Sequence, residues 1–211
     1  MVRIKVCGIT NAEDALAAVE AGADALGFNF FPPSPRYIEP AEAEQMVAQL
    51  PPFVAPVGLF VNESRPIIRT VAARCDIRTV QLHGDELPAD VAALAPLAII
   101  KAFSVGARFR PQTLKAYNGC AAFLLDTQVN GKRGGTGKPF DWKRARQARA
   151  YGRIILAGGL TVENVEEAIR TVRPYGLDVC TGVERCPGKK DHRRLREFIR
   201  RAQAAAAALE E

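Results

Sequence analysis

Short apolar segments recur at similar intervals along the whole chain. Each is rich in β-branched or bulky residues, is too short for a typical helix, and is bounded by Gly, Pro, Asn or Asp. This pattern predicts buried β-strands. The predicted strands cover residues 4–9, 23–30, 54–61, 79–83, 98–103, 121–126, 153–159 and 176–182.

Segments with helical spacing of apolar residues lie between these strands. Thr10-Asn-Ala-Glu13 has the pattern of a capping box, and it predicts a helix that ends at Gly22. Further helices are expected at residues 40–50, 64–75, 86–94, 111–117, 141–150, 162–172 and 191–209, and the pattern is weakest at 111–117.

Strictly alternating strands and helices predict right-handed βαβ units and a parallel sheet. Eight equal units favour an α/β protein with a closed (β/α)8 barrel over an open doubly wound sheet. We expect a single domain over residues 1–211, because no segment has the composition of a linker. A Pro-rich loop at 31–40 and a Gly-rich loop at 131–139 follow strands, so they should lie on the face where barrel active sites are built.

The composition excludes several classes of protein. With 211 residues, 48% hydrophobic and 25% charged, the chain is unlike a disordered segment. It has no run of about 18 apolar residues, so no membrane span is expected. Five cysteines without a C-x-x-C pair, together with two histidines, argue against a disulfide framework and a structural zinc site. We therefore expect a cytoplasmic protein without a membrane partner.

The net charge of +6 suits an anionic partner, either a phosphorylated metabolite or a nucleic acid. Much of the positive charge lies in residues 189–201. We interpret this stretch as a solvated helix face, because Phe198 is its only aromatic residue and nucleic-acid surfaces usually interleave aromatics with basic residues. A small phosphorylated substrate is therefore expected, and no nucleic acid.

A thiol and a lysine lie on the first predicted strand. Side chains alternate along a strand, so if Ile4 and Val6 face the helices, Lys5 and Cys7 face the barrel interior. A thiol acts as a base only as its thiolate, which a nearby cation favours. On this segment alone, the simpler interpretation is that Cys7 is a small buried residue and Lys5 belongs to an internal ion pair.

The sixth predicted strand ends in a carboxylate, Asp126. An acid at the C-terminal end of a barrel strand is typical of a general acid, although it could equally cap the following loop. A candidate base at Cys7 and a candidate acid at Asp126 would face each other across the barrel mouth. The combination is more informative than either residue alone.

Glycine-rich turns end the last two predicted strands and suggest a phosphate site. Gly158 and Gly159 follow strand seven, and Thr181 and Gly182 follow strand eight. Glycines let backbone N–H groups approach an anion, and phosphate sites in this fold commonly lie there. Ordinary turn glycines are the alternative. Gly135, in the GGTGK segment at 134–138, adds a third donor-rich loop that is not a Walker A motif.

Three more residues are candidates for substrate contact. Arg36, in a loop stiffened by prolines, could hold a carboxylate through its guanidinium fork, or it could be a surface arginine. His83 ends the fourth strand as a substrate contact or a hydrogen-bonded rim residue. Asp178 should face inward next to Lys5 if strands eight and one are neighbours, so we expect these two to pair.

Several motifs together resemble the phosphoribosylanthranilate isomerase family. They are KVCGIT at 5–10, GFNFFPPSPRY at 27–37, VQLHG at 80–84, GGTGK at 134–138 with FDW at 140–142, and LAGGL at 156–160. The resemblance implies a (β/α)8 barrel in tryptophan biosynthesis that needs no cofactor and no metal. It implies Cys7 as general base, Asp126 as general acid, Arg36 as ligand of the anthranilate carboxylate, and phosphate at Gly159 and the Thr181–Gly182 turn. A monomer or homodimer is expected.

Two segments depart from the family pattern, and neither contains the proposed acid or base. Cys180 stands where the family usually has a serine, and Arg185-Cys186 replaces a more serine-rich segment. The nearest alternative is another sugar-phosphate isomerase, such as the imidazole-pathway Amadori enzyme or a dual-specificity relative. Those enzymes carry an aspartate base on the first strand, so Cys7 argues against them. A metal-dependent epimerase is disfavoured by the two histidines, and a non-catalytic basic protein would need no acid–base pair.

Overall fold

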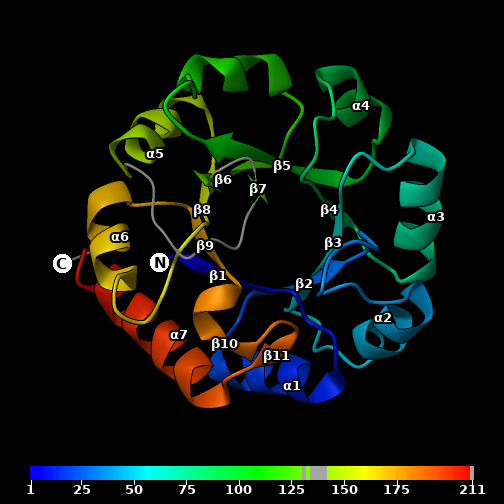
Figure 1. Ribbon diagram of the computed structural model, residues 1–211, viewed down its shortest axis with the longest axis horizontal. Coiled ribbons are helices and arrows are strands. Elements are labelled where there is room, and N and C mark those ends of the chain that lie inside the picture. Colours follow the sequence, from blue (N-terminus) through cyan, green and yellow to red (C-terminus); the bar gives the residue numbers. More distant parts are fainter. Residues whose placement is uncertain (130–131, 134–141, 210–211) are drawn as a thin grey trace.

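The computed structural model describes residues 1–129, 132–133 and 142–209 and contains a closed barrel of eight parallel strands (Figure 1). Around the ring the order is β1, β2, β3, β4, β5, β6, β8 and β9, and the pairings of β5 with β6 and of β9 with β1 close it. The predicted (β/α)8 fold is confirmed. The strands are β1 (Arg3–Cys7), β2 (Ala25–Asn29), β3 (Ala55–Phe60), β4 (Thr79–Leu82), β5 (Ala98–Val105), β6 (Ala122–Val129), β8 (Ile154–Leu156) and β9 (Gly176–Val179).

Helices surround the barrel at the positions that the sequence predicts (Figure 1). The segment with the weakest pattern forms a 3-10 helix, η1 (Pro111–Tyr117), rather than an α-helix. The α-helices are α1 (Ala12–Ala21), α2 (Pro40–Val47), α3 (Arg65–Arg74), α4 (Pro88–Ala93), α5 (Trp142–Ala148), α6 (Val165–Val172) and α7 (His192–Ala207).

Side chains from alternate strand positions build two separate apolar cores. A large core between strands and helices includes Ile4 and Val6, which confirms that these two face outward. A smaller core fills the barrel interior and includes Val57, Leu124 and Ile155. Burying each of these larger aliphatic side chains contributes roughly 1.5–3 kcal/mol. The inner core fills the barrel interior, so the space for a ligand lies at the C-terminal ends of the strands.

The start of α1 differs from the predicted capping box by one residue. Asn11 is the N-cap: its side chain accepts a hydrogen bond from the Asp14 backbone N–H at 2.9 Å, and its amide donates to the Asp14 carboxylate at 2.8 Å. Thr10 instead donates to the Gly188 carbonyl at 2.6 Å. Asn caps a helix as well as Thr does, so the two capping hydrogen bonds form between Asn11 and Asp14. Thr10 is then free of the cap and binds a distant loop.

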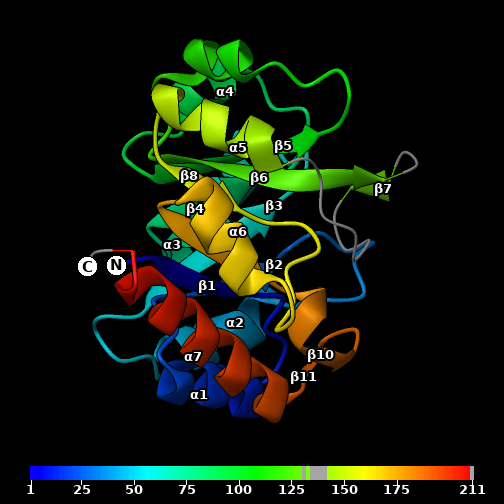
Figure 2. The same ribbon diagram turned by 90° about the vertical axis from the view of Figure 1, so that its left-hand side faces the viewer.

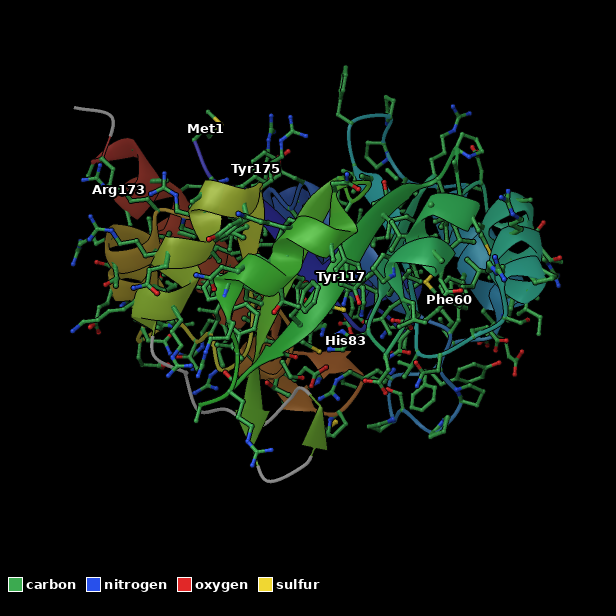
Figure 3. All side chains as sticks on the ribbon, turned by 90° about the horizontal axis from the view of Figure 1, so that it is seen from above. Met1, Phe60, His83, Tyr117, Arg173 and Tyr175 are labelled. Atoms are coloured by element: carbon green, nitrogen blue, oxygen red, sulfur yellow. The ribbon has the colours of Figure 1, made fainter. Side chains whose placement is uncertain are left out.

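Short strands that the sequence analysis missed lie on the C-terminal side of the barrel. β7 (Lys132–Arg133) pairs with the end of β6, and β10 (Glu184–Cys186) forms a hairpin with β11 (Lys189–Lys190). Figure 2 shows these strands on the side away from the N-terminus, and Figure 3 shows His83 on the side opposite Met1 and Tyr175. Among the described residues, no helix is long and apolar enough to cross a membrane.

Candidate active site

A cavity of about 630 Å³ opens at the C-terminal ends of the barrel strands. It brings together most of the predicted site residues, which come from six different strand ends or loops. Gly182 is not among the residues that line the cavity, and Gly135 falls outside the described residues. The predicted residues that line the cavity are Cys7, Arg36, His83, Asp126, Gly158, Gly159, Asp178 and Thr181.

Cys7 lies at the end of β1 and is almost completely buried. It is in register with Gly27 on β2, where a Cβ atom would lie 2.9 Å from the Cys7 sulfur and 3.0 Å from Lys5 Nζ. Glycine at position 27 therefore leaves room for both side chains. Burial raises the pKa of the Cys7 thiol, while the cations of Lys5 and Lys190 oppose that rise and Asp178 adds to it.

Lys5 and Asp178 form the ion pair that their strand positions predict. They are in register on β1 and β9, and Lys5 Nζ lies 2.8 Å from Asp178 Oδ1. Both side chains are more than nine-tenths buried. Although burial disfavours the ammonium, the nearby charges of Asp178 and Cys7 raise the pKa of Lys5 overall, so Lys5 stays protonated.

Asp126 is buried within β6, which continues to Val129 rather than ending at residue 126 as predicted. The Thr127 backbone N–H donates to its Oδ1 at 2.7 Å. Its other oxygen lies 3.4 Å from His83 Nε2. The Nδ1 of His83 lies 2.8 Å from the amide nitrogen of the buried Gln81. Because an amide nitrogen can only donate, His83 Nδ1 accepts, and the neutral ring then carries its proton on Nε2, toward Asp126. His83 is thus oriented against the candidate acid.

The Pro-rich loop after β2 is held in shape by hydrogen bonds from two polar side chains. Asn29 accepts from the Phe31 backbone N–H at 2.9 Å and donates to Ser34 Oγ at 3.0 Å, and Ser34 Oγ accepts from the Arg36 backbone N–H. This places the Arg36 side chain over Gly8, where a Cβ atom would lie 2.7 Å from Arg36 Cδ. Gly8 also has a φ of +74°, so two constraints require glycine there.

Arg36 does bind a carboxylate through two nitrogens, but the carboxylate belongs to the protein. Its Nε and Nη2 donate to Glu184 at 2.9 and 2.6 Å. These hydrogen bonds raise the pKa of the guanidinium further. The predicted fork is therefore partly occupied, and a substrate carboxylate would have to use the remaining edge of the guanidinium.

Glu184 and Lys190 were missed by the sequence analysis. Lys190 lies in the basic stretch 189–201 that we interpreted as a solvated helix face, and for Lys190 that interpretation is wrong: its side chain is fully buried on β11. Lys190 Nζ lies 3.0 Å from Glu184 Oε1 and donates to the Cys7 carbonyl at 2.6 Å. The missed signal was Pro187-Gly188, a turn dipeptide that predicts a hairpin ahead of the final helix.

The glycine turns after β8 and β9 meet beside the cavity. Gly158 and Gly159 both have positive φ values, +77° and +69°, which favour glycine. Gly182 packs directly against the Leu160 backbone, so a side chain there would push the two turns apart. Asn164, at the start of α6, donates to the Gly159 carbonyl at 2.8 Å and fixes that turn.

This arrangement can carry proton transfers on an anionic small molecule. It offers a thiol and a carboxylic acid on different walls, an imidazole against the acid, and an arginine and two glycine turns at the rim. Within residues 1–129, 132–133 and 142–209, no three His, Cys, Asp or Glu side chains are grouped to hold a metal ion.

Comparisons with known proteins agree with this geometry. The sequence model of the family described as N-(5'-phosphoribosyl)anthranilate (PRA) isomerase matches residues 4–201. An N-(5'-phosphoribosyl)anthranilate isomerase of Geobacter metallireducens is 52% identical over 204 residues, covering 97% of this chain and all of the relative.

Solved structures give the same result. A phosphoribosyl anthranilate isomerase from Thermotoga maritima is 46% identical with a TM-score of 0.90, over 97% of this chain and 100% of that one. Another, 43% identical with a TM-score of 0.87 over the same shares, is a complex with reduced 1-(o-carboxyphenylamino)-1-deoxyribulose 5-phosphate.

Proposed function

The chain belongs to the N-(5'-phosphoribosyl)anthranilate isomerase family and is an isomerase of tryptophan biosynthesis, and from this premise we propose that Cys7 and Asp126 carry out its proton transfers. The reaction is the Amadori rearrangement of N-(5'-phosphoribosyl)anthranilate to 1-(2-carboxyphenylamino)-1-deoxy-D-ribulose 5-phosphate. It opens the ribose ring and moves a proton from C2′, so it needs one acid and one base at different atoms of the same sugar.

Asp126 acts first, as general acid. It donates a proton to the ribose ring oxygen, the bond between C1′ and that oxygen breaks, and the nitrogen lone pair forms an iminium at C1′. His83 Nε2, 3.4 Å from the carboxylate, stabilises the aspartate left after the transfer. Proton transfer by a positioned group contributes roughly 10²–10⁴-fold to the rate.

Cys7 then acts as general base in its thiolate form. It removes the proton from C2′, the electron pair forms the C1′–C2′ double bond, and the iminium nitrogen regains its lone pair. The resulting enaminol tautomerises to the ketone: its hydroxyl proton passes to water, and C1′ takes up a proton from water. Cys7 then releases its proton to solvent and Asp126 regains one, which restores both groups. The iminium itself accepts the electrons. The cations of Lys5 and Lys190 support the thiolate, because each of them lowers the pKa of Cys7.

Two clamps hold the substrate between these groups. The free edge of Arg36 binds the anthranilate carboxylate, and the turns at Gly158–Gly159 and Thr181–Gly182, with Gly135, bind the phosphate. Asp178 serves the site by holding Lys5, to which it is bonded. Fixing both ends of a substrate converts binding energy into correct alignment of the reacting atoms.

One observation carries this assignment: a buried thiol on β1 and a buried carboxylate on β6, three strands apart around the ring, line the same cavity. The test is the fluorescence of freshly generated phosphoribosylanthranilate, which is lost as the substrate rearranges. We expect the purified wild-type protein to abolish the signal catalytically. A folded protein that leaves the signal unchanged would refute the proposal.

We also propose that residues 1–211 act as a single domain in the cytoplasm, as a monomer or homodimer that binds no nucleic acid. All five cysteines are free thiols, which suits a reducing compartment. Light scattering of the purified protein measures its oligomeric state. Salt-dependent binding of DNA in a gel-shift assay would contradict the proposal that it binds no nucleic acid.

A further inference from the structure

Lys190 is a buried cation that the mechanism so far uses only as a distant charge. It lies on β11, outside the barrel, and its side chain has no exposed surface. Its ammonium lies 2.6 Å from the Cys7 carbonyl, 3.0 Å from Glu184 Oε1 and 3.8 Å from Cys180 Sγ. It thus joins the backbone of the proposed base to the carboxylate that holds Arg36.

Charge balance explains why a lysine is needed there. Arg36 and Glu184 alone form a pair of zero net charge, and the side chain of Glu184 is only 4% exposed. An anionic substrate group that approached Arg36 would then meet a buried carboxylate directly behind the guanidinium. Like charges in such a site repel strongly, because little water is present to screen them.

With Lys190 included, the cluster of Arg36, Glu184 and Lys190 carries one net positive charge. Burial alone would raise the pKa of Glu184, but its bonds to Arg36 and Lys190 lower it, so the carboxylate stays ionised. Among the described residues, no hydrogen bond engages Arg36 Nη1, and Arg36 lines the cavity. The net positive charge of the cluster is therefore presented to the cavity by the Arg36 guanidinium.

We propose that Lys190 and Glu184 are positioning residues for the substrate carboxylate: Glu184 orients Arg36, and Lys190 cancels the charge of Glu184 so that Arg36 attracts one carboxylate. The inference rests on the proposed function, in which that carboxylate is the one of the anthranilate ring. It assigns specificity for a carboxylate-bearing amine to a hairpin outside the barrel.

The test compares two ligands that differ only in the carboxylate. One is reduced 1-(o-carboxyphenylamino)-1-deoxyribulose 5-phosphate, and the other is the same compound made from aniline. Their dissociation constants are measured for the wild type, Lys190→Met, Glu184→Gln and the double variant. The selectivity is the ratio of the two dissociation constants. A general loss of folding or of phosphate binding weakens both ligands equally and leaves this ratio unchanged.

We expect Lys190→Met to reduce the selectivity at least tenfold, because it leaves Glu184 uncompensated. In the double variant the selectivity should return to within about threefold of that of Glu184→Gln. Lys101→Met is the matched control: Lys101 is equally buried and pairs with Glu86 at 3.0 Å, but it does not line the cavity. Its selectivity should equal that of the wild type.

Equal weakening of both ligands in Lys190→Met, or no recovery in the double variant, would overturn the inference. If Lys190→Met folds poorly, Lys190→Gln gives the same comparison, since its amide can still donate to the Cys7 carbonyl. Wild-type turnover is measured first. A wild type that converts no phosphoribosylanthranilate refutes the proposed function, whereas an active wild type with insensitive Lys190 variants refutes only this inference.

Discussion

At the scale of single residues, the reactivity of Cys7 depends on opposing electrostatic effects. Burial and Asp178 raise the pKa of the thiol, and Lys5 and Lys190 lower it. The balance is a raised pKa, because burial outweighs the opposing effect of Lys5. At neutral pH the thiolate is therefore a minor form, and removing either cation reduces it further. Whether Lys5 tunes the thiol in catalysis stays a prediction.

Replacing Lys5 by Met tests this balance. The rate rises with pH as the thiol loses its proton, so a higher thiol pKa moves that part of the profile to higher pH. We expect the pH–rate profile of Lys5→Met to shift upward and the rate at pH 7 to fall. Ile169→Ala, which removes buried apolar atoms between the strands and the helices, should destabilise the protein without moving the profile. An unmoved profile in Lys5→Met would make Lys5 a purely structural residue.

Sequence patterns predict residues whose role follows from strand position, and they miss residues whose role follows from distant contacts. Alternation along β1 and β9 was sufficient to predict the pair of Lys5 with Asp178. Nothing local to Glu184 indicates that it would bind Arg36, which is 148 residues away. Lys190 is hidden because the basic residues that follow it, such as Arg193 and Arg194, lie exposed on α7, and its sequence does not distinguish it from them.

At the scale of elements, the turn after β8 supports the proposed acid. Gly158 has a φ of +77°, and a Cβ atom there would lie 2.5 Å from Asp126 Oδ1. We expect Gly158→Ala to displace the Asp126 carboxylate and lower kcat at least tenfold, with the backbone strain costing about 1–2 kcal/mol of stability. Gly22→Ala, at a φ of +99° after α1, carries similar strain far from the cavity and should retain wild-type kcat. Equal kcat in both variants would contradict the role of this turn.

The start of α1 is linked to the start of α7 through Asp14, which is buried. Burial raises the pKa of this carboxyl, but hydrogen bonds from the Lys190 backbone, Asn11 and His192 lower it more. Figure 1 shows the two helices side by side. The first and last α-helices of the barrel are therefore fastened together by a charged group.

Asp14→Asn should reduce the free energy of unfolding by about 1.5–3 kcal/mol at pH 7, the usual range for hydrogen bonds to a charged group. Because the folded-state pKa is lowered, the stabilisation is present above the unfolded-state value of about 3.9 and is lost as the pH falls through the folded-state value. Urea unfolding at several pH values measures this. A difference between variant and wild type that stays constant below pH 4 would contradict the assignment.

Element boundaries were predicted less well than element types. The cap of α1 moved from Thr10 to Asn11 because both residue types can cap, and only the contact of Thr10 with Gly188 distinguishes them. The hairpin of β10 and β11 was missed because its strands have three and two residues. Strands this short have no periodicity to detect.

At the scale of the whole molecule, the barrel places the proposed groups that the structure describes at one end of the parallel strands, and the repeated units of the sequence were sufficient to predict this. The inner apolar core fills the barrel below the cavity, so the proposed chemistry is placed at the mouth. The closing contact of β9 with β1 brings Asp178 beside Lys5, which is the longest-range contact that we predicted.

The proposed reaction uses the substrate's own iminium nitrogen to accept electrons, so it does not require a metal ion. We expect that dialysis of the purified enzyme against EDTA leaves kcat and KM unchanged. A loss of activity that a divalent cation restores would show that a metal takes part, and the acid–base mechanism would need revision.

The central claim is that Cys7 and Asp126 each transfer a proton. Turnover of phosphoribosylanthranilate by Cys7→Ala and Asp126→Asn, followed by fluorescence, tests it most directly. Each variant should remain folded and lose at least a few hundredfold in kcat, within the roughly 10²–10⁴-fold that a general acid or base contributes. Near-wild-type turnover by either folded variant would contradict the role assigned to that residue.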